Sequence, residues 1–130
     1  MKKVPVSAQS PHGWWVASYI ERAAWDDERK PSKKKRYLFW ENTFILQAKD
    51  RARAYEKAIH LATRGRSTFE HVKSGRKGHW EFVGLTSLLP IYEKLGDGAE
   101  IYWREYANST LGKIASKIKK RQQLEAFVDG

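Results

Sequence analysis

Residues 33–62 read KKKRYLFWENTFILQAKDRARAYEKAIHLA, and this stretch contains the change from strand to helix that decides the fold. Its residues 37–48 are rich in aromatic and β-branched side chains, which is typical of a half-buried strand, and we expect them to form the central strand of a sheet. Asp50 can accept a hydrogen bond at a helix N-terminus, and Gly65 is a suitable helix end. Between them, apolar residues recur at helical spacing: Ala54, Tyr55, Ala58, Ile59 and Ala62. We therefore predict an amphipathic helix that packs on the sheet.

The length and composition of the chain limit the classes of protein to which it can belong. With 130 residues it can bury a core without metal or disulfide support, and we expect a flexible arm at 1–13 followed by a single domain at 14–130. The chain has no cysteine, which excludes disulfides, thiolate metal sites and a cysteine nucleophile. No apolar run is long enough to cross a membrane or to act as a signal peptide. We expect a cytoplasmic protein without a membrane partner.

A first strand and a solvated loop are predicted before the central strand. Residues 14–25, WWVASYIERAAW, place apolar side chains on both faces, as in a strand that is covered on both sides. Residues 26–36 are highly charged and contain a proline, so they are expected to connect the two strands as a long hairpin loop.

Two or three further strands are expected after the helix. Residues 67–73 and 79–85 flank a glycine-rich turn and predict a second hairpin. Residues 88–95 fit either an extended segment or one helical turn, because Pro90 removes a backbone donor. Residues 100–106 alternate in polarity and predict a last strand.

The C-terminal residues 108–128 predict a basic amphipathic helix that begins near Asn108 or Ser109. Its apolar stripe, which we expect to be packed, contains Leu111, Ile114, Ala115 and Ile118. The expected fold is therefore α+β: an antiparallel sheet of about five strands, one helix packed on it after the second strand, and a C-terminal helix.

Four segments in this order resemble a family of small bacterial proteins. They are GWWVASYIERAAW, LFWENTFILQAKDRARAYEKA, WEFVGLTSLLPIYEKLGDG and EIYWREY, which together span residues 13–106. Their order is similar to that of domain of unknown function four-two-eight-eight. The resemblance implies the order of the elements and no settled activity, and members resemble single-domain proteins found beside bacterial toxin systems. The KKKR run at 33–36 and the added residues 108–130 depart from the family pattern, and both departures are basic.

A hairpin provides the strongest candidate for catalysis. It combines imidazole and carboxylate groups, which bind divalent metals or transfer protons. The residues are Glu70, His71, His79 and Glu81. Neighbouring positions on a strand point to opposite faces, so no single face can collect all four. We interpret them as polar cross-strand pairs, and we expect a protein without enzymatic activity and without a metal or cofactor.

The net charge of +10 favours an anionic partner. Together with this charge, the family resemblance implies an immunity-type protein that binds an acidic protein, with a toxin domain as one candidate partner. The alternative is a nucleic-acid-binding module, in which the basic loop would contact phosphates while the neighbouring Tyr37, Phe39 and Trp40 stack on bases. The expected partner-binding residues are Lys33, Lys34, Lys35, Arg36, Lys113, Lys117, Lys120 and Arg121.

Overall fold

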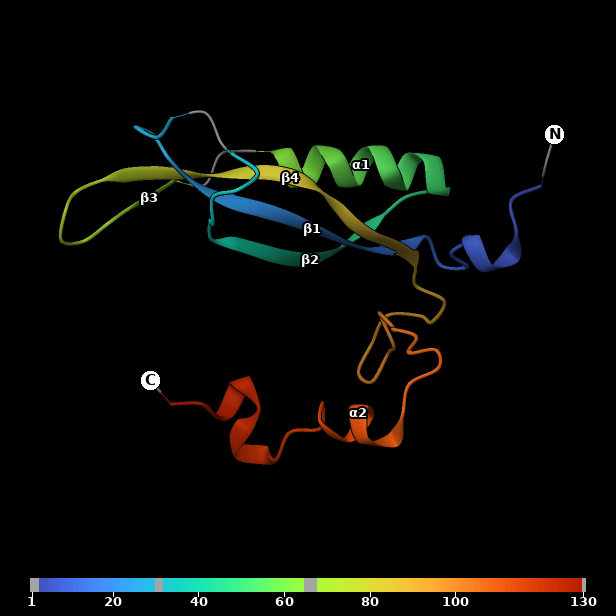
Figure 1. Ribbon diagram of the computed structural model, residues 1–130. Helices are drawn as coiled ribbons and strands as arrows, with labels where there is room; N and C mark the ends of the chain where they lie inside the picture. The colour runs from blue at the N-terminus through green and yellow to red at the C-terminus, as the bar shows by residue number, and fades with distance from the viewer. Residues whose placement is uncertain (1–2, 30–31, 65–67, 130) are drawn as a thin grey trace.

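The computed structural model describes residues 3–29, 32–64 and 68–129, and its fold is α+β. The expected helix end at Gly65 and the first residue of the expected strand 67–73 lie outside these residues. The strands are β1 (Trp14–Trp25), β2 (Phe39–Gln47), β3 (Thr68–Glu70) and β4 (Lys77–Pro90), and the helices are α1 (Arg51–Thr63) and α2 (Leu111–Ala115). The four strands form one antiparallel sheet in the order β2-β1-β4-β3, with α1 on one face (Figure 1).

The strand β1 lies inside the sheet, between β2 and β4. Trp15 and Val16 point to opposite faces of β1 and both are buried, so the prediction of a strand covered on both sides is confirmed. The prediction that the strand within 37–48 is central was wrong, because β2 is an edge strand. An interior strand that is buried on both faces carries apolar side chains on both of them. The residues of β2 instead alternate between exposed and half-buried positions along most of the strand.

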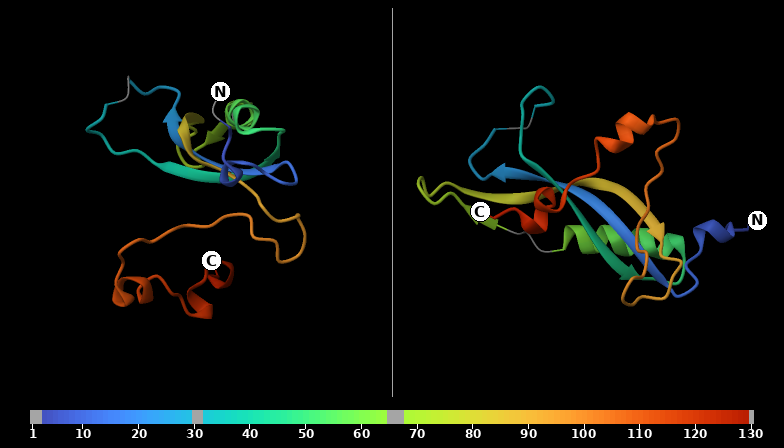
Figure 2. Two further views of the ribbon diagram at one scale, coloured as in Figure 1. Left: turned by 90° about the vertical axis from the view of Figure 1, so that its right-hand side faces the viewer. Right: turned by 90° about the horizontal axis from the view of Figure 1, so that it is seen from below.

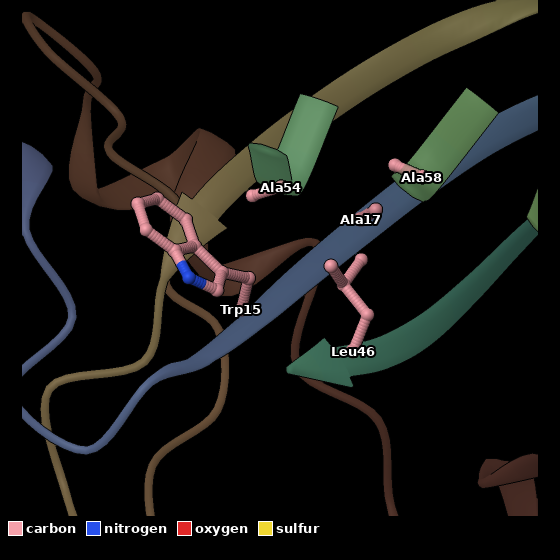
Figure 3. Close-up of a cluster of buried hydrophobic side chains, with 5 residues drawn as sticks. All are labelled: Trp15, Ala17, Leu46, Ala54 and Ala58. Atoms are coloured by element: carbon pink, nitrogen blue, oxygen red, sulfur yellow. The ribbon is translucent and has the colours of Figure 1, made fainter. Parts of the chain in front are cut away.

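The predicted helix packs on the sheet through two alanines. At its N-terminus the backbone N–H of Arg53 donates to the Asp50 carboxylate, with 2.8 Å from N to Oδ1, which confirms the expected cap. Ala54 and Ala58 have no exposed surface, and their small side chains bring α1 close to β1. In Figure 3 both alanines point toward the strands, and the buried cluster that they share contains Trp15, Ala17, Leu46, Ala54 and Ala58.

The long strand β4 contains the residues 79–85 of the second predicted hairpin and continues to Pro90, so residues 88–90 are extended. The other arm of this hairpin is the short β3. At Gly78 both neighbouring strands lie close, and an added Cβ would lie 2.3 Å from Cζ of Phe69 on β3 and 2.7 Å from the carbonyl oxygen of Ala24 on β1. A glycine is therefore needed at this position for steric reasons.

The expected fifth strand is not formed. Residues 100–106 have no regular secondary structure, and the sheet of the described chain has four strands instead of about five. An alternating pattern makes a segment able to pair, but pairing also requires a neighbouring strand edge. Here the chain leaves the sheet after Pro90 and runs below it, on the side opposite α1, as Figures 1 and 2 show from different directions.

The expected helix over 108–128 is reduced to the five residues of α2. Two 3-10 turns follow, at Arg121–Gln123 and Glu125–Phe127. The apolar stripe is not packed, since Leu111 and Ile118 are 90% and 74% exposed. A short isolated helix has little stability when no surface covers its apolar side, and Gly112 lowers the helix propensity of this segment further. Within the described residues, no helix combines the length and apolar character needed to cross a membrane.

The N-terminal residues before β1 contain a 3-10 turn at Val6–Ala8 and contact the end of β4. The hydroxyl oxygen of Ser10 lies 2.6 Å from the carbonyl oxygen of Trp14 and 3.0 Å from that of Ile91. The hydroxyl of Tyr92 donates to the carbonyl of Ser7. These contacts connect the expected arm to the point where the chain leaves the sheet.

Candidate functional site

The loop between β1 and β2 exposes the cations predicted to bind a partner. In its residues 32–36, which we name the basic loop, Lys33, Lys34, Lys35 and Arg36 are all exposed. The backbone N–H of Ser32 donates to the hydroxyl of Tyr37, with 3.0 Å between N and Oη, and this bond closes the loop on itself. The prediction of a solvated loop is confirmed for these residues.

A buried arginine anchors this loop to the sheet. Arg22 on β1 is 6% exposed and donates to the carboxylates of Glu28 at 2.8 Å and Glu81 at 2.7 Å. Its guanidinium carbon also lies 4.7 Å from the centre of the Tyr37 ring. Burial lowers the pKa of Arg22, but hydrogen bonds to Glu81 and Glu28 outweigh this effect and leave the pKa raised. Because Glu28 and Tyr37 stand at the two ends of the connection, Arg22 fixes both ends of it.

Large apolar side chains continue directly from the basic loop into the edge strand. Leu38, Phe39 and Trp40 are 58%, 48% and 52% exposed. A cavity of about 460 Å³ separates part of the loop from the sheet, and Lys33 and Lys35 contribute to its lining. The loop therefore presents positive charge beside an exposed apolar strip at the edge of the sheet.

The predicted C-terminal cations form a second group. Lys113, Lys117, Lys120 and Arg121 are exposed and belong to α2 and the turns after it, below the sheet in Figure 1. The ammonium of Lys117 lies 5.0 Å from the centre of the Tyr106 ring, and the guanidinium of Arg121 lies 4.8 Å from that of Phe127. These two cations contact rings of their own segment.

The four hairpin residues considered for catalysis have separate partners. Nδ1 of His79 lies 2.8 Å from Oδ1 of Asp26, and Glu81 is paired with Arg22. His71 contacts Ser74 within its own turn, while Glu70 is opposite Lys77 in the register. Over the described residues, no three His, Asp or Glu side chains gather in a way that could hold a metal ion.

A pocket that the sequence patterns did not reveal lies where α1 ends. Its volume is about 610 Å³, and we name it the aromatic pocket. Residues from three strands and from the C-terminal end of the helix line it, among them Tyr19, Glu21, Trp40, Asn42, Trp80 and Phe82. The pairing register puts Glu21 opposite both Trp40 on β2 and Phe82 on β4, so all three side chains share the face that carries α1.

This pocket exists because the helix is shorter than the strands beneath it. α1 covers Trp15 and Ala17 and ends at Thr63, which leaves the following rows of the same sheet face without a helix above them. The alternation of each strand was visible in the sequence. The register between strands, which brings the rings together, was not.

Comparison with known proteins gives one match. A family model described as a domain of unknown function (DUF4288) matches residues 14–103. This range begins at the first residue of β1 and includes the basic loop and the aromatic pocket, but not α2 or the C-terminal cations. Neither the curated proteins nor the solved structures give a significant match.

Proposed function

The chain belongs to the DUF4288 family, as the four ordered segments predicted, and we propose that it is a non-enzymatic binding protein of the bacterial cytoplasm. In this proposal it is an immunity-type protein whose partner is an acidic protein, such as a toxin domain. The basic loop and the apolar strip after it make the main contact. The C-terminal cations Lys113, Lys117, Lys120 and Arg121 add to the attraction at long range.

The observation that supports this proposal is that four exposed cations at 33–36 are separated by Tyr37 alone from three exposed apolar side chains at 38–40. Protein interfaces are held by a few apolar or aromatic anchors, while charges at the rim accelerate association. Leu38, Phe39 and Trp40 provide such anchors beside the basic loop. Because successive side chains of a strand point to opposite faces, a partner that contacts all three must cover the edge of the sheet at β2.

Nucleic acid is the second candidate, and the cavity between the lysines and Tyr37 is the feature that favours it. Stacking on a base requires a free ring face. Tyr37 already has the guanidinium of Arg22 over its ring, and the ring of Trp40 lies 4.6 Å from that of Trp80, centre to centre. These intramolecular contacts reduce the ring surface left for bases, so we rank an acidic protein first.

The test replaces Lys33, Lys34, Lys35 and Arg36 with serine and measures association with the protein encoded by the neighbouring gene, if that protein is acidic. We expect slower association and little change in dissociation, because charges at a rim mainly affect encounter. The control replaces Lys113, Lys117, Lys120 and Arg121 with serine, which removes the same amount of charge from the other group. A smaller effect is expected for this control.

The same proteins distinguish the nucleic-acid alternative. Nonspecific contact with short DNA or RNA is expected to be no tighter than about micromolar at physiological salt and to weaken steeply as salt rises. Nanomolar binding to an oligonucleotide at that salt, abolished by the loop replacement and retained by the control, would reverse our ranking.

A further inference from the structure

We propose that the aromatic pocket binds a small organic cation, such as an alkylated ammonium group. This site lies on the face of the sheet that carries α1, and none of the basic-loop residues lines it, although it shares Trp40 with the apolar strip of the proposed partner surface. Nothing in the family match assigns a ligand to it. Aromatic rings surround one carboxylate in this pocket.

The carboxylate belongs to Glu21 on β1, the strand that lies between the two other strands of the pocket lining. In the sheet register it is flanked by Trp40 on one side and Phe82 on the other, and Tyr19 is the next residue of β1 on the same face. The rings form two pairs: Trp40 with Trp80 at 4.6 Å between centres, and Tyr19 with Phe82 at 6.0 Å. Glu21 therefore lies between rings from three strands.

The charge of this carboxylate has no cationic partner in the described chain. Its hydrogen-bond donor is the neutral amide of Asn42, with 2.8 Å between Nδ2 and Oε1, and no Lys, Arg or His side chain of the described residues forms an ion pair with it. The opposite face of β1 differs, because there Arg22 is paired with two carboxylates. A half-buried carboxylate that has only a neutral donor among the described residues favours a ligand that brings positive charge.

Two further features favour the same ligand. The faces of aromatic rings carry negative electrostatic potential, which attracts a cation and most strongly at tryptophan. In addition, α1 directs its C-terminal end at the pocket, where residues 61–64 form part of the lining. A helix C-terminus has partial negative charge from its last carbonyl groups, so it acts in the same direction as Glu21.

The other ligand classes fit less well. An anion such as a phosphate would be repelled by Glu21 and by the helix end. A neutral apolar molecule would contact the rings but would remove water from the Glu21 carboxylate without bringing a positive charge to it. Arg64 and His79 also line the pocket, but Nδ1 of His79 is bound to Asp26 and Arg64 is exposed to solvent. A pocket of about 610 Å³ lies within the range of small-molecule sites.

The experiment follows the tryptophan indole N–H signals by nuclear magnetic resonance while choline is added to the whole protein. Its uncharged isostere, 3,3-dimethylbutan-1-ol, is added in a parallel titration. We expect saturable shifts of the Trp40 and Trp80 signals with choline, and binding of the alcohol at least about tenfold weaker. This comparison uses the unchanged protein and does not depend on the folding of any variant.

Two matched variants locate the effect. Glu21→Gln keeps an oxygen that can accept from Asn42 but removes the charge, and it is expected to weaken choline binding about tenfold. Glu41→Gln is the control, because Glu41 lies on the neighbouring strand and accepts a hydrogen bond from Thr86 without lining the pocket. It is expected to leave choline binding unchanged.

Three outcomes would overturn the proposal. The first is equal affinity for choline and its neutral isostere, which would make the pocket an apolar site without charge selectivity. The second is a dissociation constant for choline larger than about 100 mM, because binding this weak is not specific. The third is a set of saturable shifts caused by guanosine monophosphate but not by choline, which would assign the pocket to a nucleobase.

Discussion

The substitution Ala58→Glu tests how α1 is held on the sheet. Ala58 has no exposed surface and belongs to the buried cluster with Trp15, Ala17 and Leu46. A glutamate there would place a carboxylate against apolar side chains, or would push the helix away from the strands. We expect the free energy of unfolding to fall by about 3 kcal/mol or more. At about 4 °C for each kcal/mol in a domain of this size, the melting temperature would drop by at least about 10 °C.

The matched control is Ala52→Glu in the same helix. Ala52 is exposed and lies in the first turn, where a negative charge interacts favourably with the helix N-terminus. We expect its melting temperature to stay unchanged or to rise slightly. Both variants are compared by thermal and urea denaturation monitored by circular dichroism. An Ala58→Glu protein that melts like its parent would show that another face of the helix is buried and would refute the packing described for Figure 3.

Three other changes address the hairpin, the C-terminal segment and the helix cap. Gly78→Ala should reduce stability to urea by about 1–3 kcal/mol, because its Cβ would lie 2.7 Å from the carbonyl oxygen of Ala24; unchanged stability would disprove this close approach. Removal of residues 107–130 should shift the calorimetric melting temperature by no more than about 3 °C, since nearly all of these residues are exposed, and a large drop would reveal packing on the sheet. The hydrogen bond from the Arg53 backbone lowers the pKa of Asp50. The ionised Asp50 carboxylate therefore stabilises the folded protein above the ordinary carboxyl pKa, and this contribution is lost as the pH falls through the lowered pKa. Asp50→Asn, which retains a capping oxygen, should therefore weaken the acid dependence of melting below about pH 4, and an unaltered pH profile would count against this linkage.

Local patterns were sufficient to predict some elements and not others. The strand β1 has the predicted bounds Trp14–Trp25, because the density of large apolar side chains on both faces marks where an interior strand begins and ends. α1 was also predictable, since its cap at Asp50 and its buried alanines are separated by a few residues only. Such features depend on neighbours in the sequence.

Features that depend on distant pairing were not predictable. β2 has the composition of a strand, but its position at the edge follows from which strands pair with β1. Residues 100–106 alternate as a strand does, yet no described strand pairs with them. The aromatic pocket likewise requires the register that joins Glu21 to residues of β2 and β4, and a shift of one residue would send its rings to the opposite face.

The two proposed sites meet at Trp40, and this decides how they can be separated. Trp40 belongs to the apolar strip beside the basic loop and also to the wall of the aromatic pocket. Its replacement would disturb both sites, so it cannot assign an effect to either. Glu21 and the basic loop are not shared in this way, because Glu21 is half-buried on the α1 face while Lys33 to Arg36 are exposed. Loss of partner association with intact choline binding would thus concern the loop alone, and the reverse result would concern the pocket alone.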